Sequence, residues 1–189
     1  MKSLFFAAAG LLSIVSAAPA VVPGAPWEKL APPPTGTEFF QLQAKSSTTA
    51  VNNQYLALKT GSSSYAMNGT QAAASKFFST KYEKTGTWAI HNSDDTRQIV
   101  LQGSSSALLY LLDATDPRTD TIPKGQLMEW ATFTKDNNVL GVKDGSTLTN
   151  RTFAAVKQTD GSYTLALYDG ASTVDADISP VTLSLVKTA

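Results

Sequence analysis

Residues 152–168 read TFAAVKQTDGSYTLALY, two short apolar-rich runs on either side of Asp160-Gly161. Short runs of this kind, bounded by turn residues, are typical of β-strands. Asp-Gly between two such runs favours a tight hairpin turn, because both residues tolerate the positive φ angles that the turn requires. The segment therefore predicts an antiparallel β-hairpin.

The same pattern extends in both directions from this hairpin. Apolar alternations separated by Gly, Asn, Asp and Ser predict strands at residues 39–44, 54–59, 65–68, 76–82, 87–91, 97–102, 107–113, 127–134, 139–143, 152–158, 162–168 and 181–187. Asp144-Gly145 indicates a second hairpin turn. Residues 70–75 predict no more than a helical turn, because their three alanines are too few to nucleate a helix.

A weak internal period bears on the architecture. Trp88 and Trp130 lie 42 positions apart, and so do Gly61, Gly103 and Gly145 in turn. A period of this length with four strands per unit fits a β-trefoil, which hides its sheet edges by pairing its first and last strands. A two-sheet β-sandwich fits the strand count equally well, and other barrels are a further alternative. The sequence thus predicts one all-β domain, and a true repeat would bury both tryptophans at equivalent strand positions.

The first part of the chain predicts export. Lys2 precedes an apolar run at residues 4–15 that is too short to span a bilayer, and small residues follow it, so residues 1–17 are interpreted as a cleaved signal peptide. Residues 18–36 contain six prolines and are expected to form a linker. The folded domain is expected at residues 37–189, in an extracellular or cell-wall location.

Charge and cysteine content exclude several classes of function. Lys and Arg number 15, Asp and Glu also number 15, and no block of like charges occurs. This balance argues against nucleic acid and against an anionic membrane surface as partners. The chain has no cysteine, so disulfides and thiolate chemistry are excluded. We expect a monomer with no cofactor and no metal site.

Catalytic candidates are few. His91 is the single histidine and no Gly-x-Ser-x-Gly motif is present, so His91 is expected at a strand end, facing solvent. Asp113 and Asp116 belong to a segment interpreted as a turn, because Asp side chains bond to nearby backbone N–H groups. Glu129, beside Trp130, is the best candidate for the acid of a glycosidase, an activity we do not expect.

Aromatic side chains give the best candidates for ligand binding. Flat rings stack on the apolar faces of sugars, and amide or carboxylate groups bond to the hydroxyls. Trp88, Trp130 and Tyr110, together with Glu129, are therefore candidate glycan-binding residues, with core packing as the alternative role for the rings. Two sequons, at Asn68 and Asn150, are candidate glycosylation sites.

Three stretches carry a family resemblance. The Ser16-Ala17-Ala18-Pro19-Ala20 junction, the proline-rich segment after it, and residues 161–170 (GSYTLALYDG) resemble small secreted proteins of filamentous fungi, namely the phialide-type cell-wall proteins and related uncharacterised families. The resemblance implies a cell-wall or culture-fluid location and no established enzymatic role. We expect a secreted, non-enzymatic protein that binds cell-wall polysaccharide. The alternatives are an effector-type interaction protein and, less favoured, a glycoside hydrolase.

Overall fold

The computed structural model describes residues 32–117, 120–143, 145, 147–148 and 150–188. The expected signal peptide at residues 1–17, most of the expected linker, and Asp144 of the second expected hairpin turn lie outside the described residues. Within this part of the chain, no helix has the length and apolar character needed to cross a membrane.

The described residues form 14 strands and one short 3-10 helix, η1 (Gln71–Ala73), which confirms the all-β prediction. The strands are β1 (Phe40–Lys45), β2 (Tyr55–Leu58), β3 (Tyr65–Asn68), β4 (Phe77–Tyr82), β5 (Thr87–Asn92), β6 (Gln98–Ser105), β7 (Leu108–Ala114), β8 (Leu127–Glu129), β9 (Phe133–Asp136), β10 (Val139–Val142), β11 (Thr152–Lys157), β12 (Tyr163–Tyr168), β13 (Ile178–Pro180) and β14 (Thr182–Lys187). The predicted β11–β12 hairpin is present, with Gly161 at φ +80° in its turn.

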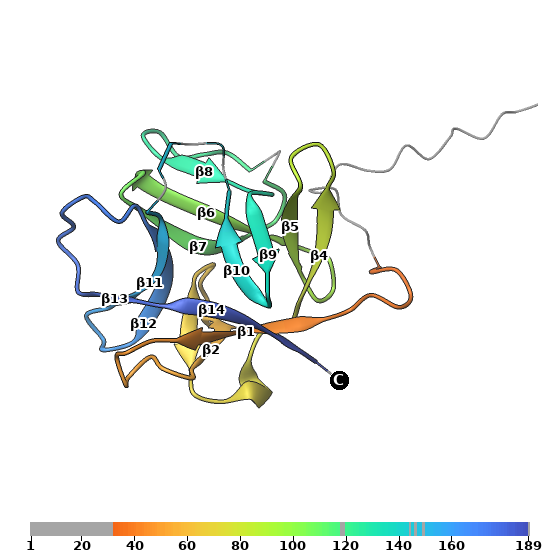
Figure 1. Cartoon of the computed structure of the whole chain (residues 1–189), viewed down its shortest axis with the longest axis horizontal. Coiled ribbons are helices and arrows are strands. Elements are labelled where there is room, and N and C mark those ends of the chain that lie inside the picture. The colour runs from red at the N-terminus through yellow and green to blue at the C-terminus, as the bar shows by residue number, and fades with distance from the viewer. Residues whose placement is uncertain (1–31, 118–119, 144, 146, 149, 189) are drawn as a thin grey trace, which may run out of the picture.

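The strands close into a barrel (Figure 1). Among the described residues, 10 strands form the ring β12-β3-β2-β1-β14-β10-β9-β5-β6-β7, and β7 pairs back to β12. The first and last strands lie antiparallel over six residue pairs, from Phe40↔Lys187 to Lys45↔Thr182. Strand β4 bridges β1 and β5, β8 pairs with β6, and β11 with β13 extends the sheet beyond β12. Closure removes exposed sheet edges from most of the ring.

Alternation along each strand decides which side chains fill the barrel. On β7, Leu109 and Leu111 are fully buried in the core, whereas Tyr110 between them is half-buried on the outer face. Residues that alternate along a strand point to opposite faces, so Tyr110 projects outward from a rigid wall. The packed core therefore holds the outer faces of β6, β7 and β12 in fixed register.

The predicted strand at residues 127–134 is interrupted. It divides into β8 and β9, because Ala131 between them has a φ of 54°, outside the extended region that a strand requires. Strand β13 was not predicted, since its Ser-Pro ending and the polar residues before it are typical of a loop.

The expected equivalence of Trp88 and Trp130 is wrong. Trp88 lies within β5 and pairs with Phe133, whereas Trp130 lies outside any strand, between β8 and β9. The glycines of the 42-residue period also differ, because Gly61 takes a positive φ in a turn and Gly103 lies inside β6. The period therefore does not mark repeated structural positions.

Candidate functional site

The candidate binding residues do not share one site. Tyr110 lines an open groove of about 640 Å³, Trp88 a cavity of about 540 Å³, and Trp130 a third cavity of about 470 Å³. Each aromatic ring therefore has to be judged by the side chains around it. We call the first two sites the Tyr110 groove and the Lys135 cavity, after the residues that dominate them.

Glu129 is committed to an ion pair. Its two carboxylate oxygens accept hydrogen bonds from Nη1 and Nη2 of Arg151 at 3.1 and 3.0 Å, in a bidentate arrangement. The Arg151 side chain is 6% exposed and that of Glu129 is 22% exposed, so the pair is largely but not fully shielded from solvent. Both carboxylate oxygens are occupied, which leaves Glu129 poorly placed to protonate a glycosidic oxygen or to bind a sugar.

The Tyr110 groove runs along the outer face of three neighbouring strands. Tyr110 on β7 lies directly opposite Gln102 on β6 and Ala166 on β12. Thr164, two residues before Ala166, shares the outer face of β12 with it. The ring of Tyr110 therefore has the polar Gln102 directly beside it on β6 and the small Ala166 directly beside it on β12, with Thr164 at a diagonal position.

Amide side chains in this groove are held by hydrogen bonds to one another and to hydroxyls. Gln102 Nε2 donates to Gln126 Oε1 at 2.5 Å, and Gln158 Nε2 donates to Thr164 Oγ1 at 2.8 Å. Gln158 Nε2 also donates to the Val156 carbonyl oxygen at 3.0 Å, so Gln158 keeps only its Oε1 acceptor for a ligand, whereas the Gln102–Gln126 pair keeps both N–H donors and acceptors. An aromatic ring beside preordered amides is an arrangement that can bind a sugar ring.

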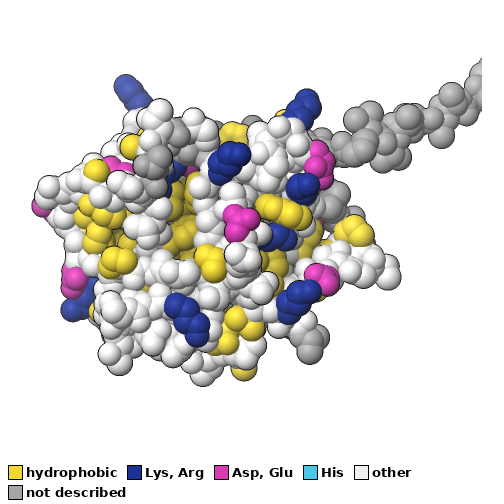
Figure 2. Space-filling model, in the orientation of Figure 1, with side chains coloured by type: hydrophobic (Ala, Val, Ile, Leu, Met, Phe, Trp, Pro, Cys, Tyr) yellow, Lys and Arg dark blue, Asp and Glu magenta, His cyan; other side chains and the backbone are white. Residues whose placement is uncertain are grey.

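The Lys135 cavity has a different chemical character. Four aromatic side chains line it, namely Phe39, Phe40, Phe78 and Trp88. The ammonium of Lys135 lies 3.6 Å from the centre of the Trp88 ring and donates a hydrogen bond to Ser79 Oγ at 2.6 Å. Figure 2 shows hydrophobic side chains at the surface over β4, β5 and β9, beside Lys or Arg and acidic side chains.

Lys135 projects from the apolar side of its strand. It lies two residues after Phe133, which is fully buried, and opposite Leu140, which is buried as well. Burial lowers the pKa of Lys135, an effect that the carboxylate of Glu38 opposes and the ammonium of Lys187 reinforces. A half-buried ammonium in apolar surroundings was not anticipated from the sequence, although Lys135 falls at an alternate position to Phe133 where an apolar residue is expected.

The single histidine belongs to a buried chain of hydrogen bonds. His91 Nδ1 lies 2.6 Å from Asp95 Oδ1, and His91 Nε2 lies 2.9 Å from Thr80 Oγ1. The imidazole also stacks on Phe78, with ring centres 4.6 Å apart. Both His91 and Asp95 have 0% exposed side-chain surface, so the expectation that His91 faces solvent is wrong.

A tight turn after β5 brings the buried Asp95 carboxylate next to His91 of that strand. Asp94 Oδ1 accepts hydrogen bonds from the N–H and hydroxyl of Thr96, and Asn92 Oδ1 accepts one from the Arg97 N–H. Asp95, at φ 55°, turns its side chain back toward His91. Asp tolerates this left-handed conformation better than most residues do.

The Asp95–His91–Thr80 chain resembles a catalytic triad in its order of contacts. A triad, however, needs an imidazole that can pass its proton to a leaving group. His91 has no exposed surface, and Phe78 covers one face of its ring. We therefore assign the chain a structural role, in which it ties the β4–β5 hairpin to the turn that follows.

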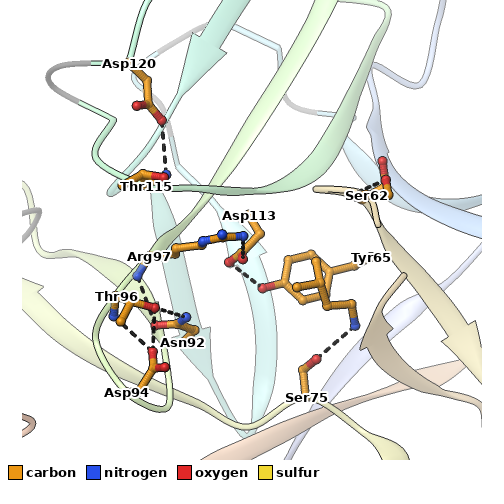
Figure 3. Close-up of polar contacts among 12 residues, drawn as sticks. Ser62, Tyr65, Ser75, Asn92, Asp94, Thr96, Arg97, Asp113, Thr115 and Asp120 are labelled. Atoms are coloured by element: carbon orange, nitrogen blue, oxygen red, sulfur yellow. Dashed lines mark hydrogen bonds and ion pairs between the residues drawn. The ribbon is translucent and has the colours of Figure 1, made fainter. Parts of the chain in front are cut away.

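A second, partly buried network connects that turn to β7 and β3 (Figure 3). Asp113 accepts a hydrogen bond from the Tyr65 hydroxyl at 2.8 Å and one from Arg97 Nη1 at 3.3 Å. Asp113 belongs to β7 and is buried, which corrects its interpretation as a turn residue. Burial raises the pKa of Asp113, and the hydrogen bonds from Tyr65 and Arg97 oppose this.

We expect Asp113→Ala to lower the free energy of unfolding by about 1–3 kcal/mol, because the buried Tyr65 hydroxyl loses its acceptor. Asp113→Asn keeps an acceptor oxygen and should cost less. A raised pKa means that the folded state binds more protons, so Asp113 should destabilise the wild type progressively as the pH rises above about 4. In urea unfolding between pH 3.5 and pH 7, the free energy of unfolding of Asp113→Asn should therefore increase relative to that of the wild type as the pH rises. A difference that stays constant with pH would contradict this.

The remaining candidates are the two sequon asparagines. Asn150 is exposed just before β11, and the backbone of Asn68 ends β3. Among the described residues, no group of three or more His, Cys, Asp or Glu side chains lies close enough together to hold a metal ion.

Comparison of the chain with protein-family models, with curated proteins and with solved structures gives no match. The chemistry of the Tyr110 groove and of the Lys135 cavity is therefore the basis on which a function can be argued.

Proposed function

We propose that this protein is a secreted, non-enzymatic cell-wall or surface protein that binds a neutral polysaccharide in the Tyr110 groove. The observation that carries the proposal is the half-buried Tyr110 ring, which lines one groove together with the Gln102–Gln126 and Gln158–Thr164 pairs. Stacking on a flat ring and bonding to amide groups are the two interactions that a sugar ring can offer a protein surface.

The charge of the groove supports a neutral ligand. Of the described residues that line it, Asp175 alone carries a charge, and the others are amides, hydroxyl side chains, small residues and aliphatic residues. A groove with no cation provides no counter-charge for an acidic polymer. The signal-like residues 1–17 and the proline-rich segment after them support delivery of the protein to the outside of the cell.

Sedimentation with insoluble chitin, β-glucan and mannan tests the proposal. We expect Tyr110→Ala to weaken binding to the retained polymer roughly tenfold, a loss of about 1.4 kcal/mol, because the stacking surface disappears. Tyr110→Phe keeps the ring and should bind nearly as well as the wild type. Tyr55→Ala is the matched control, since Tyr55 is also half-buried on a strand but does not line the groove.

Two results would overturn the proposal. One is that no polymer retains the wild type; the other is that Tyr110→Ala and Tyr55→Ala bind equally well. Release of reducing sugar that Glu129→Gln abolishes would instead favour the glycoside hydrolase, against the ion pair of Glu129 with Arg151.

A further inference from the structure

The Lys135 cavity contains a cation that has no acidic partner among the described residues. Its ammonium contacts the hydroxyl of Ser79 and the rings of Trp88 and Phe40. Glu38 lines the same cavity, but both of its carboxylate oxygens accept hydrogen bonds from Lys187 at 3.2 Å. Lys135 therefore brings into the cavity a half-buried positive charge that forms no ion pair with the described residues, and on which Glu38 acts only from beyond ion-pair distance.

The ammonium of Lys135 also has unused hydrogen-bonding capacity. An ammonium carries three N–H donors, and the described residues provide one oxygen acceptor, Ser79 Oγ. The face of the Trp88 ring orients the group but accepts a charge more weakly than an oxygen anion does. A ligand oxygen that reaches Lys135 would thus find a donor that is already positioned and partly stripped of water.

The walls around Lys135 define the rest of the ligand. Phe39 and Phe78 meet edge to face, with ring centres 6.0 Å apart, and Leu185 lines the cavity with them. A cavity volume of about 540 Å³ lies within the range of ordinary small-molecule sites. Aromatic and aliphatic side chains line one part of the space and polar side chains, Glu38 and Lys187 among them, line the rest. The volume has room for a body about the size of one aromatic ring with a short side chain.

We propose that the Lys135 cavity binds a small organic acid, whose carboxylate pairs with the Lys135 ammonium and whose apolar body packs against Phe39, Phe78 and Leu185. One cation without an acidic partner matches one negative charge. This site lies on β1, β4, β5, β9 and β14 and is separate from the Tyr110 groove, so the inference is independent of polysaccharide binding.

Calorimetric titration of the full chain with 3-phenylpropionate, and with the uncharged 3-phenylpropanamide as its isosteric partner, tests the charge requirement. We expect the acid to bind at least about tenfold more tightly than the amide, as a charge-assisted contact implies. Equal affinity of the acid and the amide, or no binding of either up to about 10 mM, would overturn the proposal.

Lys135→Met tests the residue assignment, because methionine keeps an apolar stem of similar length and removes the charge. This variant should lose the preference for the acid, so that the acid and the amide bind within about twofold of each other. Lys81→Met is the matched control, since Lys81 lies on β4 close by but does not line the cavity. A preference that survives Lys135→Met, or that Lys81→Met also removes, would refute the assignment.

Two further readouts separate ligand binding from folding. Lys135→Met removes a partly desolvated charge, so its thermal unfolding midpoint should not fall below that of the wild type; a lower midpoint would contradict the described environment.

The pH dependence of binding is the second readout. Above pH 7 the acid stays ionised, so its affinity falls when Lys135 loses its proton. Because burial lowers the pKa of Lys135, this loss of affinity should occur at a lower pH than it would with a solvent-exposed lysine. Glu38 and Lys187 are the other charged groups that face Lys135, and Lys135→Met should abolish this pH dependence.

Discussion

Replacement of His91 by Ala is expected to lower the free energy of unfolding by about 3–5 kcal/mol, because it removes the imidazole that pairs with a buried carboxylate. His91 and Asp95 have no exposed side-chain surface, and 2.6 Å separates their bonded atoms. The substitution also removes the stacking on Phe78 and the contact with Thr80. Equilibrium urea unfolding followed by circular dichroism measures the loss.

A second substitution tells the charge effect from the packing effect. Asp95→Asn keeps the shape of the side chain and tolerates the φ of 55°, but it carries no charge. In this background His91→Ala should cost less, by at least about 1 kcal/mol, because no buried charge is left without its imidazole partner. Equal costs in the two backgrounds would show that packing alone explains the loss.

The exposed pair Lys59–Asp160 is the reference for this cycle. Its side chains are 44% and 55% exposed, and Nζ lies 3.1 Å from Oδ2. Solvent screens such a pair, so the coupling between Lys59→Ala and Asp160→Asn should be much smaller than the coupling between His91→Ala and Asp95→Asn. The difference between the two cycles then reports the effect of burial on a pair of similar length.

The strands were predictable because their signal is local. Alternation and turn residues placed β3 and the β11–β12 hairpin within a residue or two of their observed bounds. The strand order was not predictable, since pairs such as Phe40↔Lys187 join the two ends of the described chain and leave no short-range pattern. The all-β class therefore followed from the sequence, whereas the closed ring needed the three-dimensional structure.

The sites were predictable by residue type and not by location. Aromatic content singled out Tyr110 and Trp88, but the strand pairing decides that one faces a polar groove and the other a cation. The burial of His91 depends on Asp95, whose left-handed backbone conformation is a property of the whole turn. Lys135 is half-buried because its strand β9 pairs with β5 beside Trp88, a contact between distant parts of the sequence.

The dipeptide Asp-Gly occurs three times, at residues 144–145, 160–161 and 169–170, and the last two flank strand β12. Both glycines have a φ of +80°. A Cβ on Gly161 would meet nothing within 4 Å, whereas a Cβ on Gly170 would lie 2.3 Å from the backbone oxygen of Asn150. Gly161 closes an exposed hairpin turn; Gly170 lies where the chain leaving β12 passes the segment that enters β11.

We expect Gly161→Ala to cost about 1–2 kcal/mol, the penalty for a left-handed backbone with a Cβ. Gly170→Ala should cost about 2–5 kcal/mol, because the same penalty adds to a displacement of the Asn150 backbone. Asparagine at each position isolates the second effect, since Asn tolerates the positive φ but still carries a Cβ. In urea unfolding, Gly161→Asn should leave the free energy of unfolding nearly unchanged, whereas Gly170→Asn should still lower it. Similar losses for the two variants would mean that Asn150 moves aside freely and that the close approach does not constrain the chain where it leaves β12.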